Sequence, residues 1–373
     1  MFGFYIFGMT DMQDMIPVLL TSLSKGKKCW VCIFDTVLSK RQFYYYEPEE
    51  VVGFIKKICH ENDLPIPEIC FYGVKDKKEF EENYRRQKPS VVFIQNITHN
   101  NISWYPIADD ASVIHLAWHK DGAKHACNSC YNISLNALRK EYDLHYFGTH
   151  GIDKIPDWFR HRIKDVDMLL KQKTKYYGNL RVEHLQYKKV LLQFPENLED
   201  KKVCFIVESH IRNDPKFQKE TGKFVDSLIT FLRSKNYYII WKNREKGWPK
   251  DKWCSPLDFS IEKPDFIIKK DLNFPSSLLH GPTISDLCLT LNCTNAIFDI
   301  QNINSNSYML NPPSIPKHED EIFKRRFEGH ATRIILDDDE SWANFAKLID
   351  VPKAISIPQS KASHKLLEDV MFL

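Results

Sequence analysis

The sequence lacks the features that define several protein classes. No stretch approaches the roughly eighteen apolar residues that a helix needs to cross a bilayer. The 52 basic residues nearly balance the 49 acidic ones, and a net charge of +3 does not indicate a nucleic-acid-binding protein. Neither a Gly-x-Gly-x-x-Gly nor a Walker motif occurs, which argues against the usual dinucleotide and ATP sites.

The sequence also lacks the signs of export and of a disulfide framework. The apolar opening, Met1–Gly8, has no basic segment before it and no clear cleavage site, so it predicts a buried strand. The ten cysteines are scattered, which favours reduced thiols and a cytoplasmic location. The pairs Cys29/Cys32 and Cys127/Cys130 have the spacing of zinc ligands. However, Cys29–Phe34 has the pattern of a buried strand, where residues three apart point to opposite faces, so we expect free thiols.

Hydrophobic periodicity instead predicts two series of alternating strands and helices. In the first half, strands are expected at 4–7, 30–34, 69–72, 90–95 and 112–117, and helices at 12–23, 51–60 and 78–86. After Gly178, strands are expected at 203–208, 237–241, 265–268, 287–291 and 333–336, and helices at 219–234, 294–300 and 340–349. This alternation predicts an α/β protein with two open, mostly parallel sheets that face a cleft.

Ligands of open α/β sheets bind beyond the carboxyl ends of the strands, so the residues after strands are the candidate site residues. The strand at 237–241 is followed by three cations at alternate positions, Lys242, Arg244 and Lys246. The planar fork of an arginine and the mobile charge of a lysine suit a diphosphate. A solvated basic loop is the alternative interpretation.

A second candidate segment follows the strand at 287–291. Small polar residues lead there into a predicted helix, so the segment Cys293-Thr294-Asn295 would present backbone N–H groups to a phosphate. Asp299, about one turn further on, would accept hydrogen bonds from ribose hydroxyls. His280, in the segment before this strand, completes the predicted donor site. The alternative is a capped helix with Asp299 exposed.

These segments resemble those of a known family. The second half is similar to the nucleotide-sugar-binding domain of GT-B glycosyltransferases, in the branch with UDP-N-acetylglucosamine 2-epimerases and CDP-glycerol glycerophosphotransferases. The likeness rests on the 242–246 loop, Ser285-Asp286, the 292–295 turn, Asp299 and the stretch 177–184, which resembles a Gly-Asn-Pro-Arg-x-Asp interdomain segment. The chain departs from that pattern at Leu180, Glu183, Cys293-Thr294-Asn295 and Asp299.

The resemblance implies a fold and a division of the chain. It implies two Rossmann-like domains facing a cleft, the GT-B architecture. Residues 1–180 would form an acceptor-binding domain and residues 181–350 a nucleotide-sugar-binding domain. The remaining segment, 351–373, would be a tail that packs back on the first domain.

The resemblance also directs attention to the loop after the first strand, where GT-B acceptor domains often hold functional residues. Sugar transfer with inversion needs a base that takes a proton from the acceptor hydroxyl, and Asp11 fits that role, with Asp14 in reserve. An N-cap for the following helix, by Thr10 or Asp11, is the alternative. His119 and Asp121 form a second cluster, either as a base with its orienting carboxylate or as sugar ligands.

A rival signal is the acidic run Asp337–Glu340, which follows a predicted strand. Asp-x-Asp at a strand end can hold a divalent metal against a diphosphate, as in GT-A glycosyltransferases. Here the run directly precedes a predicted helix at 341–349, so we interpret it as an acidic N-cap. Accordingly, we predict no metal site.

The function predicted from these observations is metal-independent glycosyl transfer. A nucleoside diphosphate sugar would be the donor, a hydroxyl group of a glycan or glycolipid the acceptor, and no cofactor or nucleic acid would take part. Protein cations would stabilise the charge that develops on the leaving diphosphate. A nucleotide-sugar 2-epimerase, a CDP-glycerol-type glycerophosphotransferase and a catalytically inactive GT-B-like scaffold remain open.

Overall fold

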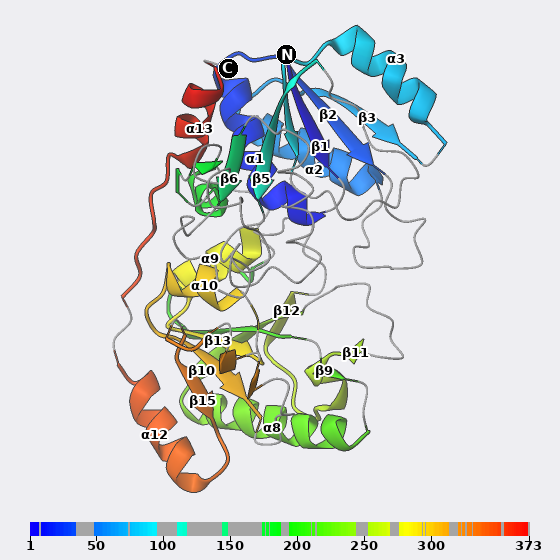
Figure 1. The fold of residues 1–373 in the computed structure, drawn as a ribbon. Coiled ribbons are helices and arrows are strands. Elements are labelled where there is room, and N and C mark those ends of the chain that lie inside the picture. The colour runs from blue at the N-terminus through cyan, green and yellow to red at the C-terminus, as the bar shows by residue number, and fades with distance from the viewer. Residues whose placement is uncertain are drawn as a thin grey trace, which may run out of the picture. The chain divides into compact units, whose positions relative to one another are not determined.

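The computed structural model contains two compact units. Figure 1 draws the fold coloured by residue number. The first unit comprises Met1–Val190 together with Gln359–Leu373, and the second comprises Leu191–Pro358. The structure describes residues 1–6, 9–34, 48–73, 75–94, 110–117, 144–147, 174–175, 177–178, 180–187, 194–209, 211–212, 215–243, 253–268, 276–292, 294, 296–312, 320–321, 323–324, 327–329, 331–351 and 354–371.

The first unit is built on a seven-stranded sheet in the order β3-β2-β1-β4-β5-β6-β7, with every neighbouring pair parallel. The strands are β1 (Phe2–Ile6), β2 (Cys29–Phe34), β3 (Glu68–Tyr72), β4 (Val91–Ile94), β5 (Ser112–Ala117), β6 (Leu144–Phe147) and β7 (Thr174–Lys175). The described helices are α1 (Met9–Ser24), α2 (Pro48–Glu61), α3 (Lys77–Gln87), the 3-10 helix η2 (Arg181–Gln186) and α13 (Ala362–Val370). Parallel strands need helical crossovers, and these helices supply several of them.

Strand β2 shows why both faces of this sheet are apolar. Cys29 belongs to the core on one face, with residues of α1 and α2. Cys32 belongs to an aromatic core on the other face, where Trp30 stacks on Phe80 of α3. The two thiols therefore point away from each other, as the strand pattern predicted, and burial raises the pKa of the Cys29 thiol to about 12. Cys127 and Cys130 lie outside the described residues.

The last helix of the chain completes the core of the first unit. Helix α13 lies beside α1 (Figure 1), and its Leu366 and Leu367 belong to the same buried cluster as Leu180. Polar contacts accompany this packing. The buried carboxylate of Glu183 accepts hydrogen bonds from the Ser363 hydroxyl at 2.5 Å and from the Ser363 backbone N–H at 3.1 Å. Glu183 thus caps the amino terminus of α13 from a distant part of the sequence.

Three further contacts extend this polar network. The Ser360 hydroxyl donates to Glu183 at 3.0 Å, and the hydroxyls of Thr21 on α1 and Ser363 lie 2.7 Å apart. The Tyr177 hydroxyl donates to Asp369 near the end of α13. The stretch that resembles the family's interdomain segment therefore anchors the end of the chain within the first unit.

We expect Glu183→Ala to destabilise the first unit by about 2–4 kcal/mol, because it leaves the buried donors of Ser363 and the half-buried hydroxyl of Ser360 without an acceptor. Glu183→Gln keeps an acceptor oxygen and is expected to cost less. Urea unfolding measures both. Glu68→Ala is the control, since the exposed Glu68–Arg86 pair contributes little. Equal loss in the Glu68 and Glu183 variants would contradict the capping role.

The second unit contains a six-stranded sheet in the order β12-β10-β8-β13-β14-β15, again with every pair parallel. The strands are β8 (Lys202–Val207), β10 (Tyr237–Lys242), β12 (Phe266–Ile268), β13 (Leu287–Leu291), β14 (Ser307–Asn311) and β15 (Arg333–Ile335). A small antiparallel pair joins β9 (Ile211–Arg212) to β11 (Trp253–Cys254). The helices are α8 (Pro215–Ser234), the 3-10 helix η3 (Pro256–Phe259), α9 (Ser276–Ile284), α10 (Ala296–Gln301) and α12 (Asp339–Ile349).

The two faces of this sheet are covered by different helices. Cys204 and Ile206 of β8 face the core formed with α8 and α12, whereas Val203 and Phe205 face α9 and α10. Helix α9 packs very closely on β8. A Cβ atom at Gly281 would lie 2.5 Å from the Phe205 ring, so only glycine fits at this contact. The described residues contain no helix with the length and apolar character of a membrane span.

The structure corrects several element boundaries. Helix α1 begins at Met9, so Asp11 lies in its first turn, and the interpretation of Thr10 or Asp11 as the N-cap is wrong. Strand β14 and helix α13 were not predicted. By contrast, Asp338 caps α12 through a hydrogen bond from the Ser341 backbone N–H at 2.8 Å. The acidic run therefore begins a helix, as predicted.

Candidate functional site

The order of the strands locates a candidate ligand site in the second unit. The chain passes from β8 to α8 on one face of the sheet and from β13 to α10 on the other, although β8 and β13 are neighbours. Open α/β sheets bind their ligands at such a reversal, beyond the carboxyl ends of the two strands. We define the carboxyl edge of this unit by Glu208, Lys242, Asn292 and Asn311, which end or directly follow β8, β10, β13 and β14.

Lys242 places a cation at this edge. It is the last residue of β10, only 6% of its surface is exposed, and its backbone carbonyl accepts a hydrogen bond from the Glu208 N–H at 3.2 Å. Alternation along β10 puts its side chain on the face of Ile240, which is covered by α9 and α10. Arg244 and Lys246 lie outside the described residues, so their predicted role in diphosphate binding stays a prediction.

Glu208 is a buried carboxylate at the same edge that the sequence analysis did not identify. One of its oxygens, Oε2, accepts hydrogen bonds from Trp241 Nε1 at 2.8 Å and from the Ser255 hydroxyl at 2.6 Å. Only 1% of Glu208 is exposed. The available signal was a charged residue at the end of the apolar run Val203–Val207, next to a predicted ligand-binding edge.

The turn after β13 is well defined where it is described. Asn292 adopts the left-handed conformation with φ of 59°, which ends the strand sharply. Thr294 is buried, and its hydroxyl accepts a hydrogen bond from the Ala296 backbone N–H at 3.4 Å, so it caps α10. Asp299 is fully buried within α10, so the alternative of an exposed Asp299 is wrong. Cys293 and Asn295 lie outside the described residues.

Two polar side chains on the face beneath α9 and α10 have unsatisfied hydrogen-bonding groups. Thr290 and Asn311 are fully buried, yet Thr290 Oγ1 and Asn311 Nδ2 have no hydrogen-bond partner within the described part of the chain. Asn311 Oδ1 does accept a hydrogen bond from Arg333 Nε at 3.1 Å. Buried polar groups are normally paired, so these atoms mark positions where a ligand or an ordered water would be stabilised.

His280 lies in α9, on the same side of the sheet. It is half-buried, and Nε2 has no hydrogen-bond partner among the described residues. Ser285 and Asp286, by contrast, precede β13 and lie at the amino edge. There Asp286 accepts a hydrogen bond from the Val203 backbone N–H at 2.7 Å. Although Ser285-Asp286 contribute to the family likeness, they therefore lie away from the edge where open α/β sheets bind their ligands.

Burial lowers the pKa of His280 below its usual value, because desolvation disfavours the charged imidazolium. The folded unit therefore favours neutral His280, which contributes to the free energy of unfolding at neutral pH. This contribution is lost as the pH falls from the usual histidine pKa of about 6.5 through the lowered pKa of the folded state. We expect urea unfolding at about pH 5 to show a smaller loss of stability for His280→Gln than for the unchanged protein. His364→Gln, at an exposed position of α13, is the control. An identical pH dependence in all three proteins would contradict this prediction.

The first unit has an equivalent switch point between β1 and β4, and α1 begins at the carboxyl end of β1. Asp11 and Asp14 are both buried, and their spacing of three residues puts them on one side of this helix. His119 and Asp121 lie outside the described residues.

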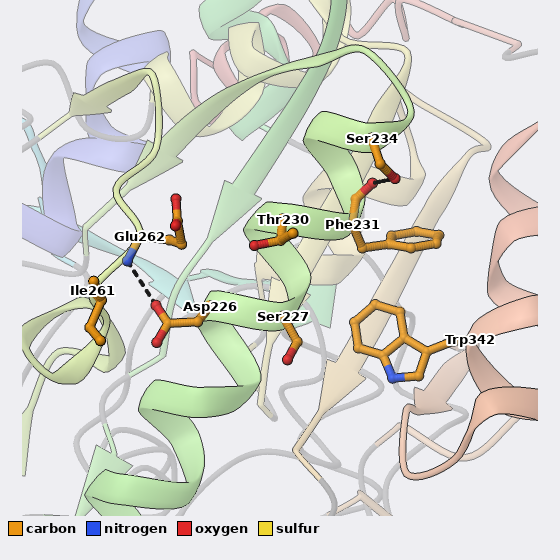
Figure 2. A pocket seen from close by; sticks show the side chains of 8 residues that line it. All are labelled: Asp226, Ser227, Thr230, Phe231, Ser234, Ile261, Glu262 and Trp342. Carbon is orange, nitrogen blue, oxygen red and sulfur yellow. Dashed lines mark hydrogen bonds between the residues drawn. The ribbon is translucent and has the colours of Figure 1, made fainter.

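A separate pocket of about 580 Å³ lies on the outer side of α8 (Figure 2). Phe231 and Trp342 form an aromatic wall with ring centroids 5.0 Å apart. Asp226 accepts a hydrogen bond from the Glu262 backbone N–H at 2.8 Å across from them. The pocket is formed by the carboxyl-terminal half of α8 and the segment before β12, so it belongs to the amino edge of the sheet, away from the switch point.

Comparisons with known proteins identify the fold. No family profile and no curated protein sequence matches the chain. The structure is similar to UDP-GlcNAc 2-epimerase from Methanocaldococcus jannaschii, with a TM-score of 0.60, 13% identity and 100% of each chain covered. It is also similar to S. aureus MnaA, solved with UDP, with a TM-score of 0.59 and 14% identity over 100% of this chain and 96% of that chain. The wall teichoic acid polymerase TagF has a TM-score of 0.55 and 13% identity over 100% of this chain and 88% of that chain. The chain thus has the predicted α/β fold of two Rossmann-like domains, the GT-B fold.

Proposed function

We propose that this chain is an enzyme that binds a nucleoside diphosphate sugar at the carboxyl edge of its second unit. The observation that carries the proposal is that a nearly buried cation and unsatisfied buried polar groups lie near the carboxyl ends of β10, β13 and β14, at or next to a topological switch point. Lys242 supplies the positive charge, and Thr290 and Asn311 supply the polar groups. The structural similarity to proteins whose names include UDP-GlcNAc and UDP supports this ligand class.

The reaction we propose is transfer of the sugar to a hydroxyl group of a glycan or glycolipid. Lys242, with the predicted Arg244 and Lys246, would stabilise the negative charge that develops on the departing diphosphate. The first unit would hold the acceptor, and the carboxylate of Asp11 would take the proton from the attacking hydroxyl as the new glycosidic bond forms. Asp14 is the reserve base, and Asp299 would contact the ribose.

A nucleotide-sugar 2-epimerase is the second candidate, and one observation favours it. The similarity to UDP-GlcNAc 2-epimerase covers 100% of both chains, whereas that to TagF covers 88% of the other chain. An epimerase changes the configuration of the sugar without an acceptor. A transferase releases a nucleoside diphosphate and needs an acceptor hydroxyl.

The experiment that tests the proposal begins with calorimetric titration of UDP-, GDP-, CDP- and dTDP-sugars into the full-length protein. The donor that binds is then incubated with and without glycan and glycolipid acceptors and followed by NMR. A new glycoside that forms only with acceptor supports transfer, and an epimer that forms without acceptor supports epimerisation. CDP-glycerol tests glycerophosphate transfer in the same way. Binding of no nucleotide would contradict the proposal and favour a catalytically inactive scaffold.

A further inference from the structure

Glu208 connects two parts of the carboxyl edge that are separated in the sequence. Trp241 is the penultimate residue of β10, and Ser255 precedes the helix η3. Both donate a hydrogen bond to the same oxygen of Glu208. Glu208 therefore joins the end of β10 to the residue that directly follows β11.

The same carboxylate residue also fixes the position of Lys242. Its backbone N–H donates to the Lys242 carbonyl, while its side chain holds the indole of Trp241, the residue before Lys242. Trp241 and Glu208 lie on the α8 face, and alternation places the Lys242 side chain on the opposite face. Glu208 therefore holds the end of β10 from the α8 face of the sheet, whereas the Lys242 side chain lies on the opposite face.

The Ser255 contact is itself part of an ordered segment. The Ser255 hydroxyl accepts from the Leu257 N–H at 3.2 Å, and the Ser255 N–H donates to Asp258 at 3.0 Å, which forms a capping box for η3. A second carboxylate, Asp226, holds the far end of η3. Its Oδ1 accepts from the Ser260 hydroxyl at 2.7 Å. It also accepts from the Glu262 N–H at 2.8 Å, as Figure 2 shows.

We propose that Glu208 is a positioning residue for the diphosphate of the bound nucleotide, acting through Lys242 and Ser255 at the carboxyl edge. The inference rests on the proposed function, which supplies the ligand. A buried carboxylate with two charge-assisted hydrogen bonds holds its partners in a single geometry, and diphosphate binding requires that geometry. Glu208 need not contact the ligand for this effect.

Asp226 provides a matched control for the test. Like Glu208, it uses one carboxylate oxygen to accept from a serine hydroxyl and an N–H group, and it ties the end of η3 to helix α8. However, it does so at the amino edge. Asp226→Ala and Glu208→Ala therefore remove the same kinds of contact from opposite ends of the same segment, and only one of them belongs to the proposed ligand edge.

The experiment measures calorimetric dissociation constants of the full-length protein for UDP, GDP, CDP and dTDP. We expect Glu208→Ala and the milder Ser255→Ala to weaken binding by about tenfold, and Asp226→Ala to leave affinity unchanged. In a double-mutant cycle, Glu208→Ala should have little further effect in a Lys242→Met background, a coupling that a merely structural role would not produce. Thermal unfolding confirms that each variant is folded.

Two results would overturn the inference, and they can be told apart. If the unchanged protein binds none of the four diphosphates, the proposed function fails and this inference fails with it. If the unchanged protein binds and both Glu208→Ala and Ser255→Ala bind as tightly as Asp226→Ala, the inference alone fails. Ser255→Ala decides the matter if Glu208→Ala does not fold, because it removes one hydrogen bond and leaves the carboxylate with Trp241.

Discussion

Lys242→Met is expected to weaken the binding of nucleoside diphosphates by about tenfold to a hundredfold, because one charge-assisted hydrogen bond to a phosphate contributes about 1.5–3 kcal/mol. Methionine fills a similar volume at this nearly buried position, so the variant is expected to remain folded. Calorimetric titration measures the affinity, and urea unfolding measures the stability.

Lys202→Met is the control for this prediction. Lys202 begins β8 at the amino edge of the same sheet and pairs with Asp350 at 3.6 Å. Removal of a cation at that edge should leave nucleotide affinity unchanged. If both variants bind nucleotides as well as the unchanged protein, or if neither does, Lys242 does not contact the diphosphate.

Asp11→Asn is expected to reduce the rate of sugar transfer by about a hundredfold to ten thousandfold, the usual contribution of a general base. Nucleotide affinity should be unaffected, because Asp11 belongs to the first unit and the proposed nucleotide site to the second. Asparagine has the same shape but cannot take the proton. Steady-state kinetics with saturating donor, together with calorimetry, measures the two quantities separately.

Two further variants define the result for Asp11. Asp14→Asn should reduce the transfer rate less than Asp11→Asn does if Asp11 is the base, and more if Asp14 is the base. Asp76→Asn is the control, since Asp76 accepts a hydrogen bond from the Gly73 N–H before α3, far along the chain from α1. Full transfer activity in both Asp11→Asn and Asp14→Asn would exclude them as the base.

The fold class could be predicted because its signals are local. The strand Leu287–Leu291 matches its prediction residue for residue, since a run that is apolar except for Thr290 and is flanked by polar residues has few other interpretations. Strand β14 was missed because buried polar residues, Ser307 and Asn311, stand at its two ends and leave only a short apolar run between them. Helix α13 was missed because the contacts that stabilise it come from residues far away in the sequence. Glu183, far away in the sequence, caps it, and its apolar face fits the core beside α1.

The candidate site was predicted less completely, and Glu208 shows why. A carboxylate after an apolar strand is visible in the sequence, but its partners, Trp241 and Ser255, are 33 and 47 residues away. No periodicity connects such positions. The opposite case is Ser285-Asp286. This short motif matches the family pattern, but the strand order places it at the amino edge of the sheet.

The contribution of α13 to the core of the first unit has a consequence for biosynthesis. A ribosome completes the last strands of that unit's sheet long before it makes the residues that seal them, because all of Leu191–Pro358 is translated in between. At roughly 5–20 residues per second, the apolar surface that Leu366 and Leu367 later cover waits on the order of ten seconds or more. The nascent first unit therefore exposes apolar surface to which chaperones can bind throughout this interval, and a fragment that stops before Gln359 should aggregate.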